Sequence, residues 1–380
     1  MSTRAILVLN AGSSSLKYAL FHAAPGAPLV EALAGEEEIA PRGAPATPDA
    51  ARDHAEALAR ALAALERRPE RAPLAAVGHR IVHGGRRCTA PTRVDDEVLR
   101  ALDELAPLAP LHQPYGLAAI RAVAAARPEL PQVACFDTAF HHTMPRSAWA
   151  FGLPRALTDA GVRRYGFHGL SYEWASERLA ELDPGARRAV VAHLGNGASL
   201  CALRDGRSVA TTMGLTPLDG LLMGTRSGAL DPGAVLYLVR ERFAGDVGAV
   251  EDLLYRRSGL LGVSGLSSDM RTLLASDHPA AAEAVELFVA RITSELGALA
   301  ATLGGLDALV FTGGIGENAA EIRARVCRAA AWMGVVLDED ANRAGAERIT
   351  RAGSPVRAWI VAAQENLVVA RQVRALLGLP

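Results

Sequence analysis

The chain has 380 residues, of which 50% are hydrophobic and 21% charged, and its 40 basic and 41 acidic residues give a net charge of −1. This length predicts two domains, each able to bury its own core. The near-neutral charge gives no electrostatic reason to expect nucleic acid or an anionic membrane as a partner. Four cysteines form no CxxC pair, and the longest uncharged stretch, Leu105–Ile120, contains three prolines. These features predict a cytoplasmic protein with reduced thiols and no membrane span.

Lysine occurs once in the sequence, at Lys17, after Asn10-Ala-Gly-Ser-Ser-Ser-Leu. A GxxxxGK[ST] phosphate loop and a protein-kinase lysine in a VAIK context are therefore both absent from the sequence. The residues around the turn predict two strands, Ile6–Leu9 and Leu16–Phe21, on either side of Gly-Ser-Ser-Ser. This strand–turn–strand unit differs from the strand–loop–helix of a P-loop.

The first section of the chain predicts an α/β arrangement. Further elements are expected as a strand near Leu29–Ile39, a helix at Ala50–Arg68, a strand at Ala75–Val82, helices at about 95–106 and 114–127, and a strand at Gln132–Phe136. A second section begins near residue 150. Its expected elements are strands at Arg188–Leu194, Ala198–Leu203 and Ser208–Thr211, helices at about 232–243, 248–257 and 279–303, a strand at Ala308–Thr312, a helix opened by Gly313–Asn318, a strand at Val356–Ala362, and a final helix at Glu365–Leu377.

Two hairpins, one in each section, have the same pattern. Leu9–Leu20 and Leu194–Leu203 both contain a strand, a polar turn of Asn, Gly and Ser, and a second strand, which suggests an internal duplication. Small residues in such turns let backbone N–H groups and hydroxyls approach phosphate oxygens closely. Tight turns without a ligand are the alternative for either hairpin taken alone.

Four side chains are candidates for chemistry. Arg80 follows an apolar strand, and Arg226 lies in a glycine-flanked loop; a guanidinium group matches carboxylate and phosphate oxygens bidentately, and a surface salt bridge is the alternative. Asp137 ends a buried strand, a usual place for a catalytic or metal-linked carboxylate. His168 lies in an aromatic turn bounded by glycines, where a structural role is the alternative. No histidine pair matches the HExxH zinc motif.

Seven ordered motifs resemble those of the acetate and propionate kinase family, within the actin, sugar-kinase and heat-shock chaperone superfamily. They are Val8–Lys17, Gly78–Gly85, Phe136–His141, Tyr165–Gly169, His193–Gly197, Met223–Gly228 and Gly313–Asn318. The resemblance covers nearly the whole chain. It implies duplicated actin-like (ribonuclease H-like) domains, each with a mixed five-stranded sheet flanked by helices, and an active site in the cleft between them. The implied domains are residues 1–148 with 366–380, and a nucleotide-binding domain of residues 149–365.

The resemblance also implies a reversible, Mg²⁺-dependent transfer of a phosphoryl group from ATP to acetate, giving acetyl phosphate and ADP, in a homodimeric cytoplasmic enzyme in which Mn²⁺ can replace Mg²⁺. The implied catalytic residues are Arg80, Asp137, His168 and Arg226. The implied acetate-binding residues are Arg80, Val82, Leu111, His112 and Pro217. The implied ATP-binding residues are Ser13, Ser15, Lys17, His193, Leu194, Gly195, Asn196, Gly197, Asp269, Met270, Arg271, Gly314, Ile315, Gly316, Glu317 and Asn318, and the implied metal ligands are Asn10 and Glu365. The pattern departs at Ala229 and at Gln364-Glu365-Asn366, where the family is more acidic.

The chemistry of such a transfer agrees with these residue types. Acetate is already an anionic nucleophile, so the reaction requires cations that overcome repulsion between two anions more than it requires a base. Asp137 is accordingly interpreted as an orienting or magnesium-water-linked group. Two alternatives remain. One is a kinase for propionate or another short carboxylate, and the other is a non-catalytic ATP-binding protein of the same superfamily. A sugar kinase is disfavoured because Val82, Leu111 and Pro217 are apolar.

Overall fold

The computed structural model describes residues 2–12, 15–39, 50–67, 72–110 and 112–380. The chain divides into two compact units. Unit 1 comprises Met1–His142, Phe167–Leu170 and Gln364–Pro380, and unit 2 comprises Thr143–Gly166 and Ser171–Ala363. The domain boundaries expected at 148/149 and 365/366 stay predictions; in the compact units, Glu365 belongs to unit 1.

Unit 1 is built on a mixed six-stranded sheet with the order β3-β2-β1-β4-β6-β5. Its strands are β1 (Arg4–Ala11), β2 (Ser15–Ala23), β3 (Val30–Glu38), β4 (Leu74–Ile81), β5 (Thr92–Arg93) and β6 (Gln132–Phe136). The first three strands are antiparallel, β4 and β6 run parallel to β1, and β5 is an antiparallel edge strand. The two-residue strand β5 therefore adds a sixth strand to the five that were expected.

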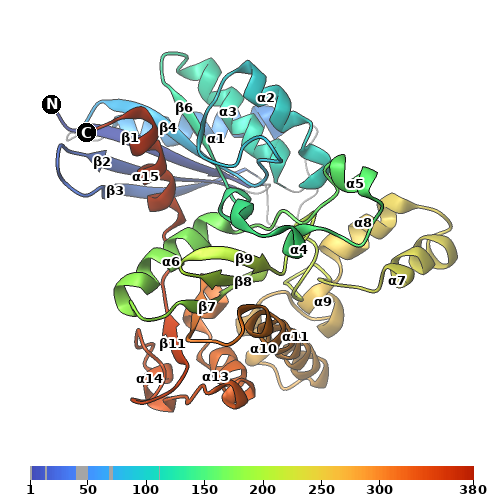
Figure 1. Ribbon diagram of the computed structural model, residues 1–380. Coiled ribbons are helices and arrows are strands. Elements are labelled where there is room, and N and C mark those ends of the chain that lie inside the picture. The colour runs from blue at the N-terminus through green and yellow to red at the C-terminus, as the bar shows by residue number, and fades with distance from the viewer. Residues whose placement is uncertain (1, 13–14, 40–49, 68–71, 111) are drawn as a thin grey trace. The chain divides into compact units, whose positions relative to one another are not determined.

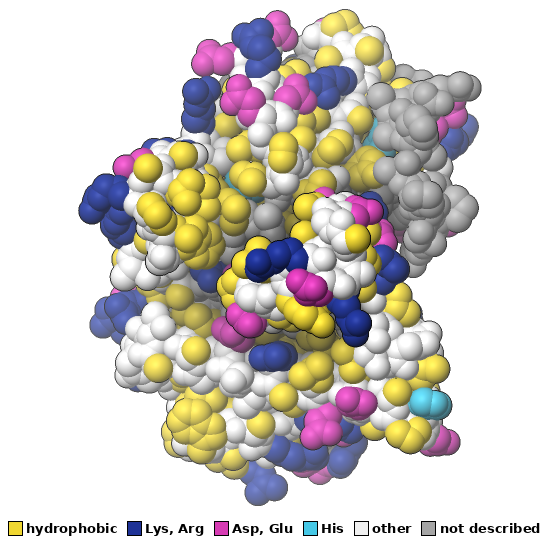
Figure 2. Space-filling model, turned by 90° about the vertical axis from the view of Figure 1, so that its right-hand side faces the viewer, with side chains coloured by type: hydrophobic (Ala, Val, Ile, Leu, Met, Phe, Trp, Pro, Cys, Tyr) yellow, Lys and Arg dark blue, Asp and Glu magenta, His cyan; other side chains and the backbone are white. Residues whose placement is uncertain are grey.

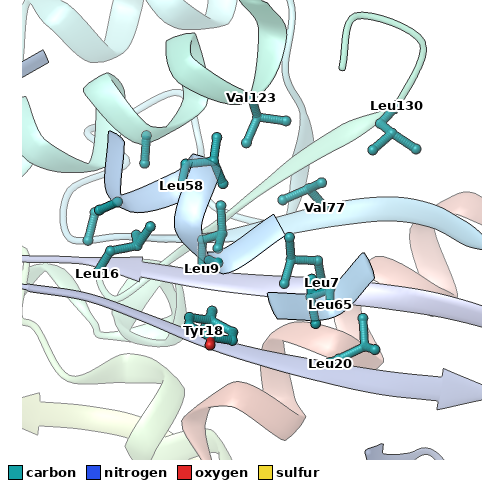
Figure 3. Close-up of a cluster of buried hydrophobic side chains, with 14 of the residues drawn as sticks. Leu7, Leu9, Leu16, Tyr18, Leu20, Leu58, Leu65, Val77, Val123 and Leu130 are labelled. Atoms are coloured by element: carbon teal, nitrogen blue, oxygen red, sulfur yellow. The ribbon is translucent and has the colours of Figure 1, made fainter. Parts of the chain in front are cut away.

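Helices cover both faces of this sheet (Figure 1). The helices α1 (Ala50–Glu66) and α3 (Gln113–Ala126) pack together on one face, with α2 (Asp96–Asp103) beside α3, and α15 (Glu365–Leu377) lies on the other. Figure 3 shows the core under α1 and α3, where Leu7 and Leu9 of β1 meet Leu58 of α1 and Val123 of α3. On the opposite face a Cβ at Gly78 would lie 2.7 Å from the side chains of Val369 and Val373, so glycine allows α15 to pack closely.

Unit 2 repeats this topology with a five-stranded sheet of order β11-β10-β7-β8-β9. Its strands are β7 (Arg188–Leu194), β8 (Ala198–Arg204), β9 (Arg207–Thr211), β10 (Ala308–Thr312) and β11 (Arg357–Ile360). The antiparallel hairpin β7–β8–β9 corresponds to β1–β2–β3, and β10 and β11 run parallel to β7 as β4 and β6 do to β1. The two hairpins that share a sequence pattern are thus equivalent in topology, as the suggested duplication predicts.

The sheet of unit 2 lies between α6 (Gly169–Leu182) and α11 (Pro279–Leu303) (Figure 1). The shorter helices are α4 (Arg146–Trp149), α5 (Arg155–Asp159), α7 (Pro232–Tyr237), α8 (Val247–Arg256), α9 (Gly259–Ser264), α10 (Met270–Leu274), α12 (Gly313–Asn318), α13 (Ala320–Ala329) and α14 (Glu339–Arg343). The helix expected at 232–243 continues from α7 into a π-helical turn at Leu238–Arg242. Among the described residues, no helix is long and apolar enough to cross a membrane. All four cysteines are buried thiols outside any disulfide.

Candidate active site

Arg80, near the end of β4, is held between two carboxylates. Its Nε donates to both carboxylate oxygens of Asp137 at 3.2 Å, and its Nη2 donates to Oδ2 at 2.9 Å. Its Nη1 lies 2.7 Å from Oε2 of Glu365, the first residue of α15. Burial alone would lower the pKa of Arg80, but the charges of Asp137 and Glu365 together raise it above its ordinary value. Arg80 is therefore a fixed cation with a defined orientation, and not an exposed surface salt bridge.

Strand topology brings Arg80 and Asp137 together. Asp137 directly follows β6, and Ile81 and Phe136 are register partners in the parallel pair β4–β6. The backbone N–H of Asp137 donates to the carbonyl of Ile81 at 3.0 Å. Because parallel strands end at the same edge of a sheet, the side chains that follow them lie close to one another. Asp137 is 1% exposed, so its charge depends on the arginine beside it.

His168 lies in a strained turn attached to the Asp137 segment. Its φ of 58° falls in the left-handed region, which is uncommon for residues other than glycine, although histidine is found there more often than most. The next residue, Gly169, donates its backbone N–H to the carbonyl of Asp137 at 2.8 Å, and a Cβ there would lie 2.1 Å from that oxygen. His141 donates from Nε2 to the carbonyl of Phe167 at 2.9 Å. The strain at His168 is thus maintained by contacts on both sides.

The loop after β4, which carries Val82, is fixed by Gln113 at the start of α3. Gln113 accepts from the N–H of His83 at 3.1 Å and donates to its carbonyl at 3.0 Å. Val82 is half-buried in this loop, and His112 immediately precedes α3. Two of the expected acetate-binding residues therefore lie in neighbouring segments of unit 1. Leu111 lies outside the described residues, and Pro217 belongs to unit 2.

The first hairpin joins β1 and β2, with Asn10 opposite Lys17 in the register. The N–H of Gly12 donates to the carbonyl of Ser15 at 2.9 Å, and His54 of α1 donates from Nε2 to the carbonyl of Gly12 at 3.1 Å. Lys17 is exposed. Ser13 lies outside the described residues.

Asn10 is on the same face of the sheet as Arg80. Val8 pairs with Gly78 and Leu9 with His79, so by alternation the next residues, Asn10 and Arg80, face α15. The first residue of α15 is Glu365. An amide oxygen and a carboxylate are hard oxygen donors of the kind Mg²⁺ prefers. No group of three or more His, Cys, Asp or Glu side chains in the described part of the chain is arranged to hold a metal.

Arg226 in unit 2 is a buried cation of a different kind. Its Nη1 donates to the carbonyl of Pro217 at 2.8 Å, and none of the described carboxylates forms an ion pair with it. It is 8% exposed, and burial lowers the pKa of its guanidinium to about 10. A desolvated guanidinium without a carboxylate partner is a candidate site for an anion.

The loop that carries Arg226 is attached to the second hairpin. The N–H of Gly224 donates to the carbonyl of Asn196 at 3.0 Å, and a Cβ at Gly224 would lie 1.9 Å from Oδ1 of Asn196. Within the hairpin, the N–H of Gly195 donates to the carbonyl of Gly197 at 3.0 Å. The structure therefore brings Arg226 to the hairpin that was expected to bind phosphate.

The helix α12 begins directly after β10 and lies against the same hairpin. Gly313 has φ of 78°, and a Cβ there would lie 2.8 Å from the carbonyl oxygen of Leu194. Oε1 of Glu317 accepts from the backbone N–H groups of Gly313 and Ala363, both at 3.0 Å. Gly313–Asn318 thus forms a short helix of its own, with Gly314 exposed at its start and Gly316 buried beneath it.

Comparison with known proteins places the whole chain in one family. Residues 5–371 match the model of the acetokinase family. The acetate kinase of Rhodopseudomonas palustris (strain ATCC BAA-98 / CGA009) is 54% identical over 387 residues, which cover 97% of each chain. The chain belongs to the acetokinase family.

Solved structures agree with this membership of the acetokinase family. The crystal structure of Porphyromonas gingivalis acetate kinase has a TM-score of 0.81 and 34% identity, and the match covers 98% of this chain and all of that one. A propionate kinase from Francisella tularensis has a TM-score of 0.83 and 36% identity, with 98% and 99% covered. The family resemblance and the α/β fold with duplicated actin-like domains are confirmed. The roles of individual side chains stay predictions.

The predicted ATP-binding residues Asp269, Met270 and Arg271 lie at the start of α10 in this acetokinase-family chain. Asp269 caps that helix by accepting from the N–H of Arg271 at 2.8 Å, and it pairs with the Arg271 guanidinium at 2.6 Å. The hydrogen bond from Arg271 lowers the pKa of Asp269 to about 2. Met270 is buried, and the side chain of Arg271 is 89% exposed. The ion pair with Asp269 is exposed and therefore weak, and the roles of both residues toward ATP stay predictions.

Two side chains that fix loops of the candidate site were not predicted from the sequence. Gln113 fixes the Val82 loop, and His54 fixes the first hairpin through Gly12. Both are buried polar residues on helices of unit 1. A buried polar group almost always has a partner, but the sequence does not say which backbone it will reach.

Proposed function

We propose that the chain is an acetate kinase, which transfers the γ-phosphoryl group of ATP reversibly to acetate and forms acetyl phosphate and ADP. The observation that carries the proposal is the contrast between two arginines. Arg80 is oriented by Asp137 and Glu365, whereas Arg226 is buried beside a glycine hairpin with no carboxylate partner among the described residues. The similarity to acetate kinases named above supports the same reaction.

The transfer needs no proton acceptor in this proposal. A carboxylate oxygen of acetate attacks the γ-phosphorus in line, and a new O–P bond forms as the bond to the β–γ bridging oxygen breaks. The electron pair leaves on ADP. Arg80 and Arg226 stabilise the equatorial oxygens and the acetate carboxylate, and His168 donates to the charge that develops. Asp137 orients Arg80, because its carboxylate oxygens already accept from the guanidinium.

A divalent cation fits the charge of unit 1. Arg80 contributes +1 and Asp137 and Glu365 contribute −2, so this cluster sums to 1 − 2 = −1. Asn10 and Glu365 would hold Mg²⁺, or Mn²⁺ in its place, because both offer oxygen donors on the α15 face. When bound, the metal neutralises charge on the nucleotide phosphates. Mg²⁺ usually needs only one or two protein carboxylates, since phosphates and water complete its shell.

ATP is proposed to lie along the glycine segments of unit 2. The donors on the unit 2 side are the backbone of Gly195–Gly197 and the start of α12, Gly314–Gly316, of which Gly314 is exposed. Ser13, Ser15 and Lys17 supply hydroxyls and a cation from unit 1. Glu317 and Asn318 support α12, since both side chains accept from or donate to its backbone.

Propionate is the alternative substrate, favoured by the similarity to the propionate kinase of Francisella tularensis. Val82, a residue of the proposed pocket, lies two residues after Arg80 in the sequence and is half-buried. One additional methylene in an apolar pocket changes selectivity by only ~1–3 kcal/mol, so an acetate kinase is expected to use propionate slowly.

A cytoplasmic homodimer is proposed as well. Four buried cysteines that form no disulfide agree with a reducing compartment. The segment around α7 exposes large apolar side chains, which are Leu230, Leu236, Tyr237 and Val247. Figure 2 shows hydrophobic side chains next to charged ones on the side of the molecule where α7 and α8 lie. Light scattering after gel filtration tests the dimer, and a monomer at micromolar concentration contradicts it.

The reaction itself is tested by trapping acyl phosphates as hydroxamates. Purified protein with MgATP is offered formate, acetate, propionate and butyrate in turn. We expect acyl phosphate from acetate at the highest kcat/KM and from propionate at a lower one. Arg226→Ala serves as the control, since it should abolish the signal. Absence of acyl phosphate with all four acids would overturn the proposal.

A further inference from the structure

A row of polar side chains crosses the sheet of unit 2 at the end of β7. His193 is the register partner of Ser199 on β8 and of Thr312 on β10. Ser199 and Thr312 are fully buried, and His193 is half-buried. His193 is the last residue but one of β7, directly ahead of the Gly195–Gly197 turn. The row therefore leads to the second hairpin.

The helix α6 makes two consecutive contacts with this row. Oγ of Ser171 lies 2.8 Å from Nδ1 of His193, and the hydroxyl of the next residue, Tyr172, is hydrogen-bonded to Oγ of Ser199. The rings of Tyr172 and His193 meet edge to face, with centroids 6.5 Å apart. Ser171 and Tyr172 are both fully buried. The position and the plane of the His193 ring are thus set by α6.

The burial of Ser171 decides which group donates in its contact with His193. A serine hydroxyl carries one hydrogen, which needs an acceptor when water is excluded. Within the described part of the chain, Nδ1 of His193 is the hydrogen-bond partner of Oγ of Ser171. If Nδ1 carried a proton and donated, the serine hydrogen would be buried without an acceptor. Ser171 therefore donates to Nδ1, and in the neutral ring the proton resides on Nε2.

We propose that Ser171 is a positioning residue that holds His193 in the Nε2–H tautomer, so that the ring presents an N–H donor to the nucleotide phosphates. The inference rests on the proposed function in one respect, namely that the His193–Gly197 hairpin binds phosphate. A neutral donor of fixed direction complements a phosphate oxygen without adding a charge that would need a counter-ion in the absence of nucleotide. A donor that is already oriented does not have to reorient when a phosphate binds, so little entropy is lost.

The tautomer is measured by NMR of the protein with ¹⁵N-labelled histidine side chains, at a pH where the His193 ring is neutral. The chain has 10 histidines, and the signals of His193 are identified as those missing from the His193→Gln variant. We expect a protonated Nε2 and an unprotonated Nδ1 in the wild type. In Ser171→Ala both tautomers should appear, and Ser171→Thr should restore the wild-type pattern. This measurement does not depend on activity.

Kinetics supply the second arm of the test. Ser171→Ala should raise KM for MgATP roughly tenfold, because the donor is misdirected in part of the molecules, and should leave KM for acetate within about twofold. Ser171→Thr should recover most of the loss. Ser199→Ala is the matched control: it removes a buried hydroxyl on the same face that does not contact Nδ1. It should leave the His193 tautomer unchanged.

Each outcome has one meaning. A protonated Nδ1 in the wild type, or an unchanged tautomer in Ser171→Ala, overturns the inference. A changed tautomer with an unchanged KM for MgATP overturns the role toward phosphate. If the proposed function itself is wrong, the wild type forms no acyl phosphate, while NMR still shows the inferred tautomer of His193.

Discussion

Replacing Arg80 and Arg226 separately by alanine should reduce activity to a similar degree and affect stability very differently. Each substitution removes a preorganised cation from the proposed reaction centre, which typically costs about 3–5 kcal/mol of transition-state stabilisation, or a factor of roughly 10²–10⁴ in kcat/KM. The two variants differ in what they leave behind in the fold. Arg80 has two carboxylate partners, and Arg226 has none among the described residues.

The stability cost of Arg80→Ala follows from Asp137. Its carboxylate is 1% exposed and receives three contacts from the guanidinium, at 2.9 and 3.2 Å. Removing one partner of a buried ion pair leaves an uncompensated charge and costs about 3–5 kcal/mol. In a unit of 150–250 residues each kcal/mol lowers Tm by about 2–4 °C, which predicts a decrease of roughly 6–20 °C.

Arg226→Ala should change stability little. The guanidinium is 8% exposed and its hydrogen bond goes to a neutral carbonyl, that of Pro217. Deleting it leaves one carbonyl without a donor, at a cost of about 1–3 kcal/mol, and at the same time removes a desolvated cation whose burial is itself unfavourable. The two effects oppose each other, so Tm should stay within a few degrees of the wild-type value.

Thermal unfolding and the hydroxamate assay on the same preparations test this contrast. The double variant Arg80→Ala/Asp137→Asn is the decisive control, because it removes the orphaned charge and should recover most of the lost Tm without recovering activity. Arg80→Lys should retain stability better than activity, since an ammonium group cannot make the bidentate contact. Equal Tm values for Arg80→Ala and Arg226→Ala would refute the reasoning from ion pairing.

Three further outcomes are expected. Lys17 is the single lysine, so amine-directed labelling should modify it and the N-terminus, and saturating MgATP should protect it; equal labelling with and without nucleotide would place it outside the site. Val82→Ala should lower KM for propionate more than KM for acetate, and kcat for acetate should stay within about an order of magnitude of the wild-type value. If the ratio of kcat/KM for propionate to kcat/KM for acetate is unchanged, Val82 does not line the pocket. Burial lowers the pKa of His79 from 6.5 to about 4. Between these two pH values the unfolded chain binds more protons than the folded one. The unfolding free energy should therefore fall by about 3 kcal/mol as the pH drops from 6.5 to 4. His79→Gln should abolish this component in denaturation curves measured across the same pH range.

Features that depend on local pattern could be predicted from the sequence. Apolar alternation and small polar turns predicted both hairpins, and apolar runs predicted the strand that contains Arg80 and the strand that precedes Asp137. The parallel pairing of these two strands, from which the ion pair follows, was not predicted from the sequence. Arg226 was found because a charged residue among glycines has no helical or strand pattern to explain it.

Features that depend on packing between distant segments could not be predicted. Nothing in the residues around Glu365 shows that α15 begins beside Arg80, because the register of a helix on a sheet is set by its apolar contacts, here with Gly78. The helix α6 was missed because it starts at Gly169, directly after the strained turn at His168, where glycine and positive φ resemble a loop. With α6 missing, the contact from Ser171 to His193 had no basis in the sequence.

Equivalent strand ends in the two duplicated sheets carry different chemical groups. In unit 1 the charged side chains Arg80, near the end of β4, and Asp137, directly after β6, form an ion pair, and Arg80 also pairs with Glu365. In unit 2 the equivalent β10 is followed by Gly313 and Gly314, and after β11 the backbone N–H of Ala363 donates to Glu317. Side-chain charge suits the small anions whose repulsion must be overcome, and bare backbone suits a large nucleotide that must approach closely. One ancestral topology can thus serve both substrates of a phosphoryl transfer, because the residues that follow its parallel strands are free to change while the strands remain.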